Sequence, residues 1–295
     1  MARVKPDESP AATEWRTLLD ADGSASAARR IAAILHDPRS LSLRAELLEW
    51  LCGFAESTAY DPNADDECRA VLPEVYTAVL PFIDNDDLAV REAALGVVSV
   101  LPDLADARLF QRVLASSGDR RERASAVFGL GEAGADTTSL LTDADPAIRV
   151  CAALTPGCAD DSEATRLILE ALRDPAAADA WFPEPLPQFD GWFRFTLVAA
   201  AIERAETFED LLPAALAVVA VGSCYTVDSD WGPLLAKAFP TPYDGTLTSA
   251  QRSFLSAVAE NDRNWGTVAN PLIWLRKAGL PETRDELREL VRSGT

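Results

Sequence analysis

The stretch Arg123–Leu154, RASAVFGLGEAGADTTSLLTDADPAIRVCAAL, decides the fold. It opens with an apolar helical pattern that ends in the glycines of GLGEAG, and a short second helix is expected over 136–141. The turn Asp143-Ala-Asp-Pro then leads into Ile148–Leu154, which repeats the opening pattern. One such helical hairpin is too small to bury its apolar face alone, so it must stack on similar neighbours. The sequence therefore predicts an all-α fold of stacked helical hairpins.

The same frame recurs along the chain: an acidic turn, then an arginine, then small apolar residues. Arg44, Arg91, Arg123 and Arg149 occupy the same position in it. Apolar residues at helical spacing predict further helices, over 24–36, 41–60, 68–83, 84–101, 107–116, 162–173, 192–205, 206–221, 248–261, 265–279 and 281–292. No useful length of the chain alternates with period two, so no sheet is expected.

The recurring frame D-x-[DP]-x-x-[VI]-R-x-x-A-x-x-x-L resembles HEAT repeats, most closely over 84–173. The 119–154 segment, with its abbreviated second helix, resembles the short subtype found in phycobilisome lyases. The pattern from 247 to 281 resembles a terminal segment of a bacterial subfamily of HEAT-repeat proteins. This resemblance implies a right-handed α-solenoid of HEAT-like hairpins.

In that family the turn aspartate and the helix arginine form a hydrogen-bonded ladder between successive repeats. The resemblance assigns this structural role to Asp87, Arg91, Asp119, Arg123, Asp145 and Arg149. Such a role is physically reasonable, because an acid near a helix N-terminus caps free N–H groups and a partly buried arginine needs a fixed acceptor.

Three regions are expected: a polar lead-in over 1–12, HEAT-like repeats over 13–173, and C-terminal helical repeats with long loops and a terminal cap over 174–295. The third region differs from the second in its aromatic residues, because its last 120 residues hold 14 of the chain's 22. Three irregular stretches interrupt its helices, over 174–191, 222–233 and 239–245.

The chain carries 47 acidic and 27 basic residues, for a formal net charge of −20. A protein that binds DNA or RNA must neutralise phosphates with lysine and arginine, so this balance argues against nucleic acid. It favours a cationic partner, or simply solubility. Residues 176–246 hold ten acidic and three basic residues among aromatic ones. Because loops carry function on rigid scaffolds and tryptophan and tyrosine are typical interface anchors, the residues expected to bind a partner are Trp181, Trp192, Tyr225, Asp228, Asp230, Trp231, Tyr243 and Asp244.

No catalytic, cofactor or metal site is expected. The GxGxxG pattern at Gly129–Gly134 follows a helix, whereas a dinucleotide site requires a preceding strand, so these glycines are expected to end the helix in left-handed conformations. A single histidine, His36, and five cysteines without a CxxC pair nearly exclude a standard zinc site. The cysteines are expected to be reduced.

The sequence thus predicts a cytoplasmic, non-enzymatic scaffold whose acidic concave or loop-lined surface binds a basic protein segment. No apolar run approaches the roughly 20 residues that span a bilayer, and the N-terminus lacks an apolar signal core. One alternative is an immunity-type antitoxin or inhibitor of a basic toxin. A second, from a different class, is an enzyme or accessory lyase with a pocket near 181–245.

Overall fold

The structure is a computed structural model that describes residues 15, 19, 23–189 and 191–293. The predicted polar lead-in over 1–12 lies outside these residues. Within them the chain forms α-helices and short 3-10 helices and no strand, which confirms the all-α prediction. The chain divides into two compact units, each described by itself. Unit 1 comprises 1–137 and 186–188, and unit 2 comprises 138–185 and 189–295.

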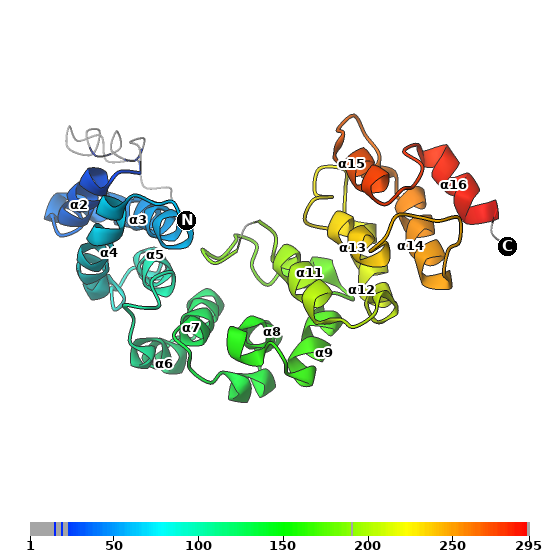
Figure 1. Ribbon diagram of the computed structural model, residues 1–295. Helices are drawn as coiled ribbons and strands as arrows, with labels where there is room; N and C mark the ends of the chain where they lie inside the picture. The colour runs from blue at the N-terminus through cyan, green and yellow to red at the C-terminus, as the bar shows by residue number, and fades with distance from the viewer. Residues whose placement is uncertain (1–14, 16–18, 20–22, 190, 294–295) are drawn as a thin grey trace, which may run out of the picture. The chain divides into compact units, whose positions relative to one another are not determined.

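Unit 1 is built of antiparallel helices joined by short turns. Its elements are α2 (Ala25–Ile34), η1 (Pro38–Leu43), α3 (Arg44–Tyr60), α4 (Asp66–Val79), η2 (Leu80–Phe82), α5 (Leu88–Ser99), α6 (Ala107–Ser116) and α7 (Arg120–Glu132). Helix α3 packs on α5 and α5 packs on α7, so these three helices form a row (Figure 1). Helix α4 contacts α2, α3 and α5, while α6 packs on α7.

One hydrophobic core runs through α2 to α7. Helix α5 shows why: Val90, Ala93, Ala94, Val97 and Val98, at the spacing i, i+3, i+4, i+7 and i+8, are all buried. Two residues between them, Leu95 and Gly96, are buried as well, so α5 is covered on more than one side. Burial of each large aliphatic side chain stabilises the fold by about 1.5–3 kcal/mol.

Aspartates in the turns start the six successive helices α4 to α9, of which α8 (Pro146–Leu154) and α9 (Ser162–Ala171) belong to unit 2. Oδ1 of each aspartate accepts the backbone N–H of the residue two positions further on. This bond satisfies one of the N–H groups that have no acceptor within the first turn of the helix. Aspartates cap α4, α5, α6, α7, α8 and α9 in this way, at Asp65, Asp87, Asp106, Asp119, Asp145 and Asp161. The acidic turns seen in the sequence are therefore N-caps.

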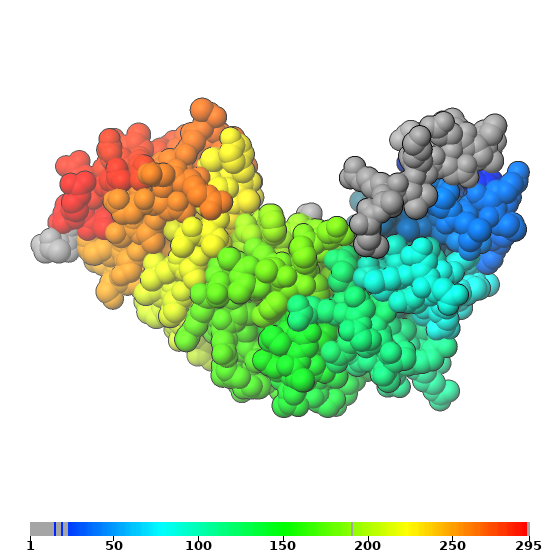
Figure 2. Space-filling model, turned by 180° about the vertical axis from the view of Figure 1, so that it is seen from behind, coloured from blue at the N-terminus to red at the C-terminus, as the bar shows by residue number. Residues whose placement is uncertain are grey.

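Unit 2 contains shorter helices and longer loops. Its elements are η3 (Thr138–Thr142), α8 (Pro146–Leu154), η4 (Pro156–Cys158), α9 (Ser162–Ala171), α10 (Pro175–Asp179), α11 (Phe193–Arg204), α12 (Phe208–Val221), α13 (Trp231–Ala238), α14 (Ser249–Glu260), η5 (Asp262–Asn264), α15 (Asn270–Lys277) and α16 (Arg284–Ser293). Helices α11, α13 and α15 form one row and α12, α14 and α16 form a second. The orange and red surfaces of α14 and α16 adjoin in Figure 2.

Two predictions about helices in unit 2 were wrong. Helix α13 occupies 231–238, although its first three residues, Trp231-Gly-Pro, were placed in an irregular stretch. Proline at the third helical position is compatible with a helix, because the first-turn N–H groups have no intrahelical acceptor. Helix α15 begins at Asn270 and not near 265. The indole N–H of Trp265 instead donates to the carbonyl of Val258, and residues 265–269 are not helical.

The glycines of GLGEAG do not all end helix α7. Only Gly134 has a left-handed φ, +72°. Gly129 lies inside α7, where a Cβ would stand 2.3 Å from Cε1 of the Phe110 ring. This glycine is therefore required by the close approach of α6, and the prediction of left-handed conformations holds only for the last of the three. The short second helix expected over 136–141 is the 3-10 helix η3.

All five cysteines are free thiols, as expected. Burial raises the pKa of the Cys52 thiol to about 12, and also raises that of Cys151. None of the helices in the described ranges combines the length and apolarity needed to cross a bilayer.

Candidate functional site

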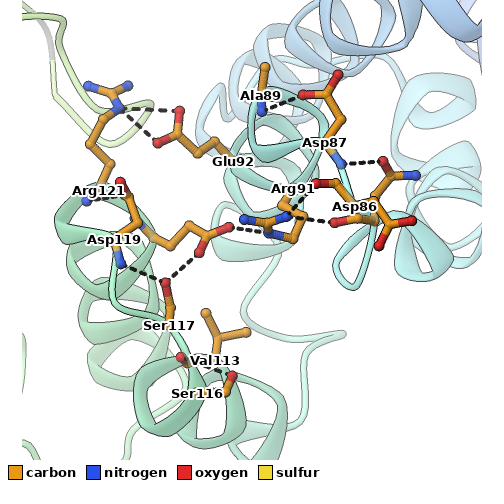
Figure 3. Close-up of polar contacts among 12 residues, drawn as sticks. Asp86, Asp87, Ala89, Arg91, Glu92, Val113, Ser116, Ser117, Asp119 and Arg121 are labelled. Carbon is orange, nitrogen blue, oxygen red and sulfur yellow. Dashed lines mark hydrogen bonds and ion pairs between the residues drawn. The ribbon is translucent and has the colours of Figure 1, made fainter.

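In unit 1, a polar link joins two successive helices of the row (Figure 3). Arg91 on α5 donates its Nε–H to Oε1 of Glu122 on α7 over 2.6 Å. The Nη1 group of Arg91 turns the other way and donates to the carbonyls of Asn85 and Asp86, in the turn that precedes its own helix. One guanidinium thus fixes its own turn and contacts the next helix of the row.

Glu122 is almost fully buried, and the surrounding groups satisfy both of its oxygens. Oε1 accepts from Arg91, while Oε2 accepts from the hydroxyl of Ser117. The Ser117 oxygen in turn accepts the backbone N–H of Asp119. A second pair, Arg121 with Glu92, crosses between the same two helices at 3.3 Å. A buried carboxylate with a full set of partners stabilises a single packing geometry and leaves no acceptor unpaired.

The predicted ladder is corrected at one position, the partner of Arg91. Asp87, Asp119 and Asp145 each cap their own helix. The acceptor for Arg91 on the neighbouring helix is Glu122 and not the turn residue Asp119. Arg149, like Arg91, donates to carbonyls of its own turn, those of Asp143 and Ala144. The ladder contact of Arg123 stays a prediction. Glu122, three residues after a capping aspartate, was missed.

In unit 2, a buried ionic network joins three separate segments. Arg194, at the start of α11, donates its Nε–H to Oδ1 of Asp230 over 2.9 Å and its Nη1 group to Asp179. The backbone N–H of Arg194 also donates to Oδ1 of Asp179. The side chains of all three residues are more than nine-tenths buried. Asp230 precedes α13 and Asp179 ends α10, so the network connects the first and second irregular stretches.

One guanidinium faces two carboxylates, and this imbalance affects the protonation of Asp230. Burial raises the pKa of Asp230, against the hydrogen bonds of Arg194 and Thr226, and the like charge of Asp179 acts in the same direction as burial. Burial alone would lower the pKa of Arg194, but its bonds to Asp230 and Asp179 raise it, so the arginine remains charged. The network therefore holds one more carboxyl group than guanidinium, and burial favours the protonated form of Asp230.

Two exposed aromatic side chains border this network. Trp192 is 48% exposed, and the guanidinium carbon of Arg194 lies 5.4 Å from its ring centroid. Tyr225 is 78% exposed and precedes Thr226, whose carbonyl accepts the backbone N–H of Asp230. The loop around Tyr225 is further fixed by the hydroxyls of Ser223 and Thr226, which lie 3.0 Å apart. Both rings are thus presented by segments attached to one buried network.

Two of the predicted contact residues are part of the core. Trp231 is fully buried, and so is the neighbouring Asp230, whose side chain is bonded to Arg194. Neither side chain reaches the surface, and the interpretation of them as partner-binding residues is corrected on that ground. The physical reason is local: Trp231 opens helix α13, whose apolar side packs on α11, α12 and α15. Large rings near loops are commonly buried in this way.

The other predicted contact residues differ in their surroundings. Asp228 is exposed but accepts hydrogen bonds from Asn270 and from the indole of Trp274, so it fastens its loop to α15. Tyr243 is half-buried, and its backbone N–H donates to the carbonyl of Ala278. Asp244 is exposed and accepts the N–H of Thr246 within its own turn. The third irregular stretch is not connected to the Arg194 network by any hydrogen bond among the described residues.

Trp181 lines an open groove of about 480 Å³ between α8, α9 and α10. The apolar part of this groove includes Val150 and Leu167. On its rim, Arg166 is paired with both Glu163 and Glu170 along one face of α9. The groove is separate from the Arg194 network in its lining residues, so the structure does not bring Trp181 into one site with Tyr225.

No protein-family model matches the chain, and no curated protein matches its sequence.

Proposed function

We propose that the protein is a non-enzymatic binding scaffold that receives a basic protein segment on the surface around Trp192 and Tyr225. The observation that carries this proposal is that two exposed aromatic side chains are held by loops tied to one buried ionic network. Rigid aromatic side chains lose little conformational entropy on binding, and they are enriched among residues that dominate interface energy.

The charge of the same segment supports a cationic partner. Residues 176–246 hold three basic side chains. Arg194 is buried in the network, Arg204 donates to the carbonyl of Cys158, and the ammonium of Lys237 donates to the carbonyl of Ala205. Of the nine acidic residues of this segment that the structure describes, only Asp179 and Asp230 belong to the buried network. The charge that this segment presents to solvent is therefore negative, which favours association with a basic partner.

We further propose that both units are stacks of HEAT-like repeats in a right-handed α-solenoid. Rows in which helices two apart along the chain pack together, such as α3 with α5 and α12 with α14, support this interpretation. Such stacks commonly serve as extended binding surfaces.

The test is selection from a random peptide library displayed on phage, followed by fluorescence polarisation with the enriched peptides. We expect enrichment of arginine and lysine, and binding that weakens as salt is raised. Trp192→Ala with Tyr225→Ala should weaken binding at least tenfold, since anchor residues typically contribute about 1.4 kcal/mol or more. Tyr60→Ala, an exposed ring in unit 1, is the matched control and should bind like the wild type. Enriched peptides without a basic bias would contradict the proposal.

A further inference from the structure

Three residues of a long loop pack with unit 1. Leu186-Pro187-Gln188 groups with residues 1–137 by its contacts, although the chain on both sides of it groups with unit 2. Leu186 is only 2% exposed, so a loop residue is as buried as the core of a helix. The surface of unit 1 against which these three residues pack accounts for this contact.

That surface contains a glycine in the middle of helix α5. A Cβ on Gly96 would stand 2.9 Å from Cγ and 3.3 Å from Cβ of Pro187, and 3.4 Å from Sγ of Cys52. The first distance is shorter than carbon atoms tolerate, so the proline ring fits only because the glycine has no side chain. Glycine inside a helix costs about 1 kcal/mol relative to alanine. The helix therefore carries a destabilising residue at the point where the proline ring lies.

The polar contact beside it is directional. The Nε2 group of Gln188 donates to Oγ of Ser99 over 2.6 Å, and Ser99 donates its own hydroxyl hydrogen to the carbonyl of Gly96 over 2.9 Å. Because that hydrogen is used within α5, the Ser99 oxygen can only accept. Ser99 is itself 2% exposed, so it selects a side chain that brings a donor into a buried place.

We infer that Cys52, Gly96 and Ser99, the Gly96 site, form a recognition site for a Leu-Pro-Gln segment of a partner protein. In this structure residues 186–188 of the same chain occupy that site. The inference goes beyond the proposed function, because it concerns unit 1 and a neutral segment. The surface provides space for a proline ring and an acceptor for the glutamine amide, and the leucine of the bound segment is itself buried.

The chain's own segment competes with any partner for this site. A tethered segment acts at an effective concentration in the millimolar range, so a free segment must exceed that level or add contacts of its own. Three residues bury little surface, which makes such an exchange accessible. The Gly96 site is thus available to a partner whose sequence matches the internal segment and extends beyond it.

The test uses the full chain with Leu186→Ser, Pro187→Gly and Gln188→Ser combined, called the open variant. A fluorescein-labelled peptide of residues 182–189, Phe-Pro-Glu-Pro-Leu-Pro-Gln-Phe, is titrated by fluorescence polarisation. We expect saturable binding to the open variant and at least tenfold weaker binding to the wild type. Circular dichroism establishes that the open variant is folded.

A matched pair of glycine substitutions decides whether the peptide binds at the Gly96 site. In the open variant, Gly96→Ala should abolish binding, because the new Cβ occupies the place of the proline ring. Gly53→Ala, on α3, has nothing within 4 Å of its new Cβ and should leave binding unchanged. Peptide binding insensitive to Gly96→Ala would overturn the inference, as would no binding to a folded open variant.

Failure of the open variant to fold, or dimerisation of the wild type, would also count against the inference. An open variant that fails to fold would make residues 186–188 part of the core and not a displaceable segment. Gln188→Ala alone removes one hydrogen bond and is expected to keep the fold, with binding intermediate between those of wild type and open variant. A concentration-dependent dimer of the wild type in light scattering would assign the site to exchange between copies of this chain and overturn the role of a different partner.

Discussion

Arg194 and Asp230 form a buried ion pair, with 2.9 Å between Nε and Oδ1, and a second carboxylate from Asp179 shares the same guanidinium. The amino-acid composition does not show which acidic side chains are buried, and this network identifies Asp179 and Asp230. Of the many acidic residues in the C-terminal half, these two are withdrawn from the surface. They fix the loops from which Trp192 and Tyr225 project.

This pair predicts a pH dependence of stability with a defined sign. Burial raises the pKa of Asp230 above its ordinary value of 3.8. The folded protein then holds this proton more tightly than the unfolded chain does, so the contribution of Asp230 to stability is largest below pH 3.8. It declines as the pH rises through the folded-state pKa. We expect the free energy of unfolding of the wild type, relative to Asp230→Asn, to fall as the pH rises over the range above 3.8.

Urea unfolding of both proteins across that range measures the difference, in which the other titrating groups largely cancel. A difference that grows with rising pH would show that Arg194 lowers the pKa of Asp230.

The link between α5 and α7 predicts an energetic coupling. Arg91 and Glu122 are partly or almost fully buried, with side-chain exposures of 28% and 7%, so removing either partner leaves a polar group unpaired. We expect a double-mutant cycle of Arg91→Ala and Glu122→Ala to give a coupling of about 1.5–3 kcal/mol. The pair Arg112 and Asp84, exposed by 56% and 68%, is the control and should couple by less than about 1 kcal/mol. Equal coupling energies in the two cycles would show that burial does not strengthen the Arg91–Glu122 pair.

The two predicted aromatic contacts that differ most in burial predict opposite phenotypes. Trp231→Ala should destabilise the protein by about 3–5 kcal/mol, because it empties a fully buried site. Tyr225→Ala should change the unfolding free energy by no more than about 0.5 kcal/mol and act on partner binding alone. Chemical denaturation followed by far-ultraviolet circular dichroism measures both. A Trp231→Ala protein as stable as the wild type would show that this ring is not part of the core, and its prediction as a contact residue would stand again.

The glycine beneath the Phe110 ring predicts a destabilising alanine inside a helix. Gly129→Ala improves helix propensity by about 1 kcal/mol, but its Cβ would stand 2.3 Å from the ring, so α6 and α7 must separate. We expect a net loss of about 1–3 kcal/mol. Gly53→Ala meets nothing and should be neutral or stabilising. Thermal unfolding of the two variants tests the contrast, and a stabilised Gly129→Ala would mean that the ring moves freely.

The sequence was sufficient to predict most helices because local signals and packing agree there. Asp106 caps α6 and Ser117 follows its end, as the pattern over 107–116 indicates. The α13 helix was missed because Gly232 and Pro233 are turn residues by composition, and only contacts with distant helices show that they lie in a first helical turn. Gly232 has a spatial reason, since a Cβ there would meet the indole of Trp274 at 2.6 Å.

The candidate site was less predictable, since burial of a side chain depends on residues distant in sequence. Tyr225 and Trp231 lie in the same acidic, aromatic stretch, yet one is 78% exposed and the other fully buried. Nothing within the stretch distinguishes them. Glu122 carried a usable signal, the D-x-x-E spacing from Asp119, but its role as the acceptor for Arg91 depends on a residue 31 positions away.

The arginines that bond to carbonyls have a consequence for how the turns can vary. Arg91 and Arg149 hold their turns through backbone oxygens, which every amino acid supplies. The side chains at positions such as Asp86 and Ala144 are therefore not needed for these bonds. Substitution there can alter surface chemistry while the turn keeps its course, so these positions are suited to diversification, whether by natural drift or in a designed library.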